Sequence, residues 1–230
     1  MPTEKESKVE KNITAVEHAL SNSELFIEKN QKIIMYVVGA IVLIIGGYIG
    51  FKKFYLAPKE KEAQSQMFWA ERYFEKDSLN LALNGDGNNP GFIDIIDQYG
   101  MTKSANLANY YAGMCFLKKG QFEEAINYLK KFDSNDLIVS SMAKGAIGDA
   151  YMELGDNEKA IDYYIKAISN NNLFTTPMFL MRAGWTYENM GNYTEALKLY
   201  ELIQKEFYKS SESREIEKYI TRAKGMLNQK

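Results

Sequence analysis

Residues 148–155 (GDAYMELG) decide the fold, because close copies of them stand at residues 113–120 (GMCFLKKG) and 184–191 (GWTYENMG). The copies are spaced 35 and then 36 residues apart. Each is followed, after a short turn, by a Glu-Ala or Lys-Ala pair, whose alanines are Ala125, Ala160 and Ala196. Self-similarity at a fixed period of this length indicates that one supersecondary unit repeats along the chain.

The residue types in each copy predict a pair of antiparallel helices. The first glycine has no side chain, so a second helix crosses close to it, and the aromatic residue three places later fills the space beside it. The second glycine tolerates the left-handed backbone that ends a helix. The alanine after the turn lets the second helix pack back against the first.

This pattern resembles the tetratricopeptide repeat, which has these residues at these offsets and a period of about 34 residues. The resemblance implies an all-α fold, a solenoid of helical hairpins in which neighbouring units support one another. Three units are expected within residues 105–209, at about 106–139, 141–174 and 177–209. Residues 52–104 are expected to form a juxtamembrane helix and a degenerate first unit, with Ala70 and Tyr73 replacing the glycine and the aromatic residue. Residues 210–230 are expected to form a capping helix.

Residues 33–51 (IIMYVVGAIVLIIGGYIGF) carry no charged residue and no proline. As a helix they extend about 28 Å, close to the hydrocarbon thickness of a bilayer. A buried core helix seldom lacks polar residues over such a length, and a signal peptide starts nearer the N-terminus and has a shorter apolar region. The run therefore predicts one transmembrane helix. Residues 1–32 form a charged tail that is expected to be partly helical, with a helix start at Ser21. For residues 1–20 a polar, frayed state is favoured over the alternative, a short amphipathic helix at Glu10–Leu20 that docks on a membrane surface or a partner helix.

The lysines beside this run bear on its orientation. Those within about 15 residues, the distance over which they count, are Lys29 and Lys32 before it and Lys52, Lys53, Lys59 and Lys61 after it. Taken alone, the excess after the run places the C-terminal domain in the cytoplasm, because loops rich in Lys and Arg stay on that side.

The composition excludes several classes of function. A net charge of −2 provides no basic footprint for nucleic acid. The single cysteine, Cys115, excludes an internal disulfide, and the single histidine, His18, lies in the N-terminal tail. A Ser-His-Asp triad, a Cys-His pair or a site with several His ligands is therefore not expected. We predict no enzyme activity, no metal and no cofactor.

The resemblance to tetratricopeptide arrays also implies a binding surface. In those arrays the concave groove is lined by fixed positions of the first helix of each pair. Methionine is flexible and suits the binding of varied apolar segments. The alternative is that several of these side chains pack between repeats. The groove positions carried onto this chain are Leu107, Tyr110, Met114, Leu117, Met142, Asp149, Met152, Met178, Met181, Trp185 and Glu188.

The order of segments (charged tail, one anchor, degenerate repeat, three repeats and cap) resembles the YfgM-like proteins, ancillary subunits of the bacterial SecYEG translocon, in the forms expected from Bacteroidetes-like bacteria. The resemblance implies an inner-membrane protein with its repeats in the periplasm. Its partners would be translocon subunits, a periplasmic chaperone or isomerase, and unfolded polypeptide emerging from the membrane. The alternative is a scaffold in another envelope assembly, for cell division or secretion, that binds one fixed partner.

Overall fold

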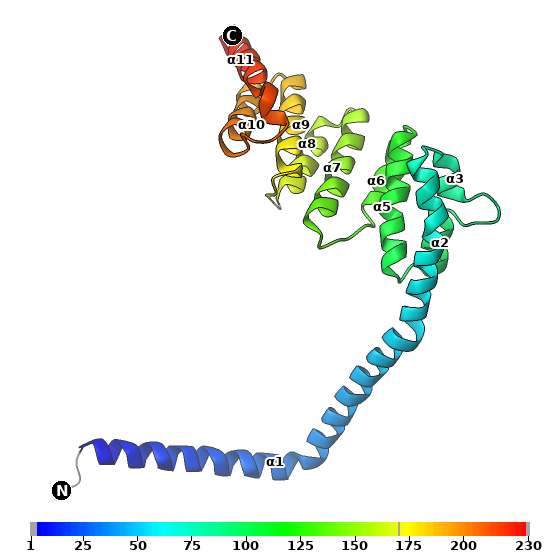
Figure 1. Ribbon diagram of the computed structural model, residues 1–230. Coiled ribbons are helices and arrows are strands. Elements are labelled where there is room, and N and C mark those ends of the chain that lie inside the picture. The colour runs from blue at the N-terminus through cyan, green and yellow to red at the C-terminus, as the bar shows by residue number, and fades with distance from the viewer. Residues whose placement is uncertain (1–3, 170, 229–230) are drawn as a thin grey trace. The chain divides into compact units, whose positions relative to one another are not determined.

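The computed structural model describes residues 4–169 and 171–228 (Figure 1). Among these residues the chain is helical and contains no β-strand, which confirms the all-α prediction. The chain divides into two compact units, Met1–Ala57 and Pro58–Lys230.

The first unit consists of helix α1 (Glu4–Gly50) and the π-helical turn η1 (Phe51–Leu56). The backbone is already helical at Glu4, so the preference for a frayed polar tail and for a helix start at Ser21 was wrong. The reason is local: residues 4–38 contain no glycine and no proline, so nothing interrupts the helical hydrogen bonds. The charged N-terminal stretch and the apolar run therefore share one helix.

The apolar part of α1 has no core of its own. The helical run Phe26–Glu75 contains a window with a mean hydropathy of 2.4, and no residue of that window is buried. Side chains such as Leu43 and Ile44 are largely exposed. By length and composition this helix is able to cross a membrane.

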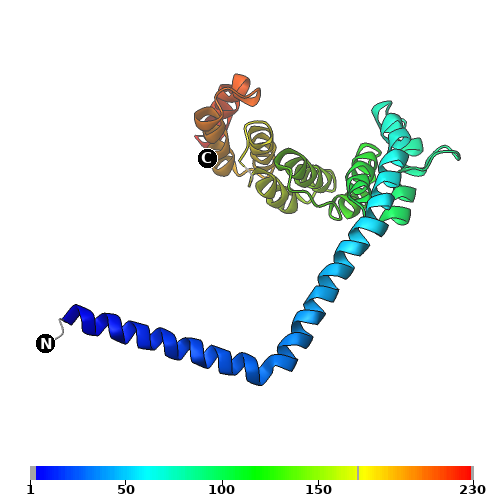
Figure 2. The same ribbon diagram turned by 60° about the horizontal axis from the view of Figure 1, so that its bottom comes forward.

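The second unit is a stack of antiparallel helical pairs, which Figures 1 and 2 show from two directions. The pairs α5–α6, α7–α8 and α9–α10 follow one another, and α11 packs against α10. Before them come α2, α3 and α4. The helices are α2 (Ala57–Glu75), α3 (Leu79–Asn84), α4 (Phe92–Tyr99), α5 (Lys103–Lys118), α6 (Phe122–Leu129), α7 (Leu137–Glu153), α8 (Asn157–Ile168), α9 (Thr175–Asn189), α10 (Tyr193–Glu206), the 3₁₀ turn η2 (Glu212–Glu215) and α11 (Ile216–Leu227).

The first glycine of each sequence repeat lies where the two helices of a pair cross. A Cβ atom built on Gly148 would lie 2.6 Å from a ring carbon of Tyr164 and 3.2 Å from the carbonyl oxygen of Ala160. Ala160 is fully buried. Side chains of the second helix likewise occupy the space beside Gly113 and Gly184. The close approach of helices expected from the sequence is therefore present in each pair.

The second glycine of each repeat ends the first helix. Gly120, Gly155 and Gly191 have φ angles of +75°, +78° and +72°, the left-handed region that favours glycine. Side chains cap the second helix in two of the three pairs: Asp156 accepts a hydrogen bond from the backbone N–H of Lys159 at 3.1 Å, and Asn192 accepts one from that of Glu195 at 3.3 Å, whereas Gln121 at the start of α6 forms no side-chain cap. The tight turns between paired helices are thus encoded locally.

Residues 58–99 differ from the later pairs through an additional short helix, α3, and the loop after it. The carboxylate of Asp86 organises this loop by accepting hydrogen bonds from the Tyr73 hydroxyl (2.5 Å) and the backbone N–H groups of Asn88 (2.8 Å) and Asn89 (2.7 Å). These bonds, the Tyr73 bond above all, lower the pKa of Asp86 well below its usual range.

Candidate functional site: the concave groove

A groove of about 590 Å³ lies across the first helices α5, α7 and α9. Leu117 and Phe122 line one end, Met152 the middle and Trp185 the other end. The Trp185 side chain is 42% exposed, so its indole is accessible. The full lining is Leu117, Lys118, Gly120, Phe122, Asp149, Met152, Glu153, Tyr164, Arg182, Trp185 and Thr186.

A polar cluster forms the middle of the groove. The carboxylate of Asp149 pairs with the guanidinium of Arg182 and accepts a hydrogen bond from the Tyr164 hydroxyl at 2.9 Å. Burial, together with the nearby Asp149 carboxylate, raises the pKa of Tyr164, so this hydroxyl remains a neutral donor. Both charged side chains are about one-third exposed. The groove therefore presents the Asp149–Arg182 ion pair, which carries no net charge, between apolar walls.

The walls of the groove are held in register by contacts one repeat apart. The Thr186 hydroxyl lies 3.2 Å from the Met152 sulfur. Trp185 packs against Tyr219 of α11, with ring centroids 5.9 Å apart. Beyond Trp185 lies a second hollow of about 400 Å³, where Glu188 pairs with Arg222. Trp185 thus borders both hollows and is anchored on one side only.

The structure separates the sequence-predicted groove residues into several groups. Leu117, Asp149, Met152 and Trp185 line the groove, and Glu188 lines the second hollow. The others are half-buried and pack partly between repeats: Tyr110 and Met114 against the cluster around Ile126 and Leu129, and Met142 and Met178 against the cluster around Tyr164 and Phe179. Leu107 lines a different hollow beside Phe132 and also packs against the core around Phe92.

Met181 does not line the groove. It is buried and packs in the core with Leu180, Tyr200 and Ile220. The physical reason is helical periodicity: Met181 stands three residues before Gly184, the residue that faces Tyr200 of α10, and so shares its inward face.

Seven of the eleven residues that line the groove were not predicted from the sequence, and among them Arg182 is the one that forms the ion pair with Asp149. It occupies no position that the repeat motif marks, yet it pairs with Asp149, which stands 33 residues earlier. A sequence signal does exist: opposite charges about one repeat period apart fall on neighbouring first helices. The Glu188–Arg222 pair has the same spacing, 34 residues.

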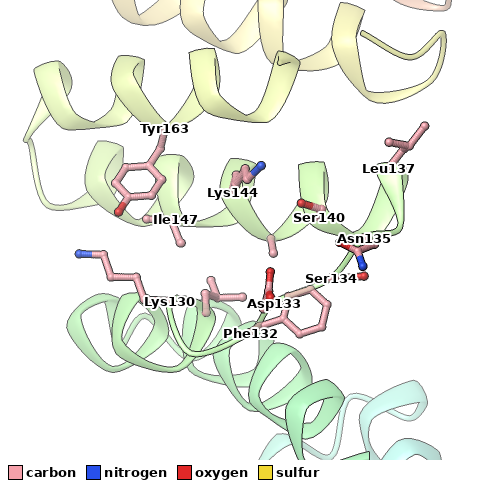
Figure 3. Close-up of a pocket in the computed structure, with 12 residues that line it drawn as sticks. Lys130, Phe132, Asp133, Ser134, Asn135, Leu137, Ser140, Lys144, Ile147 and Tyr163 are labelled. Atoms are coloured by element: carbon pink, nitrogen blue, oxygen red, sulfur yellow. The ribbon is translucent and has the colours of Figure 1, made fainter. Parts of the chain in front are cut away.

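A further hollow, of about 430 Å³, lies between α6, the loop after it, α7 and α8 (Figure 3). Lys130, Lys144 and Tyr163 are among the residues that line it. The Lys130 ammonium donates a hydrogen bond to the Tyr151 hydroxyl at 3.2 Å, and this bond raises the pKa of Lys130. The lining includes the last residue of α6, which has 8 residues against 12 in α8, and residues of the loop after it.

The comparisons with known proteins agree with this geometry. Models of the tetratricopeptide repeat match residues 107–135, 143–172 and 179–210, on the pairs α5–α6, α7–α8 and α9–α10. The chain carries tetratricopeptide repeats. Repeats of this kind form protein-interaction modules with extended concave surfaces. No group of three or more His, Cys, Asp or Glu side chains among the described residues could hold a metal ion.

Solved structures share the fold. A crystal structure of MamA protein is 20% identical with a TM-score of 0.53, over 71% of this chain and 91% of MamA. A crystal structure of nearly identical TPR-like repeats from a Podosopora anserina putative kinesin light chain is 13% identical with a TM-score of 0.55, over 74% of this chain and 89% of that one. No curated protein sequence matches the chain.

Proposed function

We propose that this protein is a membrane-anchored interaction module whose groove holds an apolar segment of a partner protein. The observation that carries the proposal is the composition of the groove: Leu117, Met152 and Trp185 surround the Asp149–Arg182 pair. The apolar side chains offer contact area, and the ion pair offers a donor and an acceptor to a peptide backbone. A segment with a large apolar side chain against Trp185 and exposed peptide groups over the ion pair fits this pattern.

The finer assignment is an ancillary subunit of the translocon, anchored in the bacterial inner membrane, with the repeats in the periplasm. The partners would be translocon subunits, a periplasmic chaperone or isomerase, and emerging unfolded polypeptide. The order of the segments and the adaptable methionine in the groove support this proposal. The ordered Asp149–Arg182 and Glu188–Arg222 pairs favour the second candidate, a scaffold in another envelope assembly, because preformed pairs suit one fixed partner.

The two tryptophans of the chain allow a matched test of the groove. Trp185 and Trp69 are similarly exposed, at 42% and 45%, but only Trp185 lines the groove. An anchoring tryptophan at the centre of an interface contributes about 2 kcal/mol or more. Trp185→Ala is therefore expected to weaken binding at least about tenfold, because 1.4 kcal/mol corresponds to a factor of ten. Trp69→Ala should leave the affinity unchanged.

The measurement begins with affinity capture of the full chain from gently solubilised membranes, followed by titration of the identified partner. Translocon subunits would support the first assignment, and division or secretion proteins the second. Thermal melting checks that both variants are folded. If the folded Trp185 and Trp69 variants bind with equal affinity, the partner binds outside the groove.

Orientation is tested separately. Alkaline phosphatase fused after Lys230 should be active, because this enzyme matures only outside the cytoplasm, and a fluorescent protein that does not fold after export should stay dark. The reverse pattern would follow the lysine excess after residue 51 and would leave a cytoplasmic scaffold.

A further inference from the structure

The loops that lead into the first helices, together with the first turn of α7, carry large apolar side chains that are exposed to solvent. We call these side chains the loop edge. Each is between 46% and 77% exposed, whereas Leu154 and Met190, at the turns within the pairs, are 40% and 43% exposed. The residues of the loop edge are Met101, Leu137, Ile138, Leu173, Phe174 and Tyr208.

Contacts between neighbouring repeats place these loops along one side of the second unit. The Asn106 side chain near the start of α5 exchanges two hydrogen bonds with the backbone of Asp133 in the α6–α7 loop, at 2.7 and 3.0 Å. The contacts between α7 and α9 join residues 33 or 34 positions apart, so the two helices run parallel and in register. Leu173 and Phe174 lie beside Tyr208 around one hollow of about 430 Å³. The loop edge is therefore continuous from α5 to α11.

The same edge is where the second unit begins. The carboxylate of Glu60, in the first turns of α2, accepts hydrogen bonds from the backbone N–H groups of Lys103 (2.6 Å) and Ser104 (3.1 Å) at the start of α5. The apolar run ends at residue 51, nine residues before Glu60. Nine helical residues span about 14 Å. If the apolar run crosses a bilayer, the chain therefore tethers the end of this edge at Lys103 and Ser104 within reach of the lipid surface.

We propose that the loop edge docks on the lipid bilayer, with Leu173, Phe174 and Tyr208 inserted at the interface. This inference rests on the proposed membrane anchor and is independent of what the groove binds. Aromatic and aliphatic side chains presented along one side of the array suit a broad lipid surface, and tyrosine favours the headgroup region. Lys209 follows Tyr208 in its loop and Lys103 begins α5, and both side chains are able to pair with anionic headgroups.

The experiment labels single cysteines of the full chain with an environment-sensitive nitrobenzoxadiazole dye in vesicles of phosphatidylcholine and phosphatidylglycerol. Leu173→Cys places the dye on the loop edge, and Leu154→Cys is the matched control in a turn on the opposite side. The native Cys115 is fully buried and burial raises its pKa to about 12, so it does not compete for the dye at neutral pH.

We expect the dye at position 173 to emit at shorter wavelength, to be quenched by nitroxide-bearing lipid and to be shielded from aqueous iodide. The dye at position 154 should show the opposite pattern. Adding Phe174→Ser and Tyr208→Ser to the position-173 variant should lower the lipid quenching at least about twofold, because interfacial binding scales with buried apolar area.

Equal iodide quenching at positions 173 and 154 would overturn the inference. A second result would also overturn it: the dye at position 173 is shielded from iodide but not quenched by the lipid, and the shielding increases with the ratio of protein to lipid. That result would show that the loop edge contacts a second copy of the chain. Flotation of the vesicles after alkaline washing reports the anchor alone. Chains that float without lipid quenching refute edge docking and leave the anchor and the groove intact, whereas chains that do not float refute the anchor and the docking together.

Discussion

The contact between Gly148 and Tyr164 predicts how Gly148→Ala changes the stability of the chain, and the sign of that change depends on tertiary packing. A Cβ added at Gly148 would meet two ring carbons of Tyr164 at 2.6 and 2.7 Å. The ring is held in place, because it is buried and its hydroxyl is bonded to Asp149. Overpacking a core costs about 1–3 kcal/mol, and replacing glycine by alanine inside a helix returns up to about 1 kcal/mol. We expect Gly148→Ala to destabilise the second unit by about 1–2 kcal/mol.

Gly225 of α11 provides the control for this substitution. A Cβ there would meet no atom within 4 Å, and no left-handed φ is involved. Gly225→Ala should therefore stabilise the chain by about 0.5–1 kcal/mol through helix propensity alone. The same chemical change is thus expected to have opposite signs at the two sites.

Urea unfolding of the full chain in detergent micelles measures both effects. Trp69 and Trp185 report on the second unit, because the sequence contains no other tryptophan. With a slope of about 2 kcal/mol per molar urea, Gly148→Ala should lower the midpoint by about 0.5–1 M. An unchanged or raised midpoint for Gly148→Ala would show that the helices of this pair do not cross at Gly148.

Two further predictions follow from ionisable groups. Burial raises the pKa of Cys115 to about 12, so iodoacetamide at pH 7.5 should modify it slowly in the native chain and rapidly in urea, as followed by mass spectrometry; equal rates would contradict its burial. The hydrogen bond from Tyr73, with those from Asn89, lowers the folded-state pKa of Asp86, so its stabilisation is present above pH ~4 and is lost as the pH falls further. Tyr73→Phe should reduce this loss between pH 5 and pH 2 in urea melts, and an unchanged pH profile would argue against the Tyr73–Asp86 bond.

Much of the fold was predictable because its determinants are local. The left-handed φ angles at Gly120, Gly155 and Gly191 and the buried Ala160 follow from single residue types at fixed offsets. The apolar helix follows from an uninterrupted run of residues. The continuous helix from Glu4 was underestimated, because polar composition was given more weight than the lack of a residue that breaks helices.

The groove was predictable only in part. Leu117, Asp149, Met152 and Trp185 came from the repeat motif, whereas the placement of Met181 in the core depends on which face of α9 meets α10. Arg182 was missed because its partner stands one whole repeat away. The position of a residue along one helix therefore does not by itself decide whether its side chain lines the groove or packs in the core.

By itself, the sequence determined the helices, their turns, the repeat and the apolar run, because each depends on steric and hydrophobic properties within a few residues. Only the tertiary structure decided which side chains of the first helices face the groove. It alone showed the Asp149–Arg182 pair and the alignment of Leu173, Phe174 and Tyr208 along the loop edge. These features require helices of different repeats to be placed side by side, and that placement depends on packing between residues that are more than 30 positions apart.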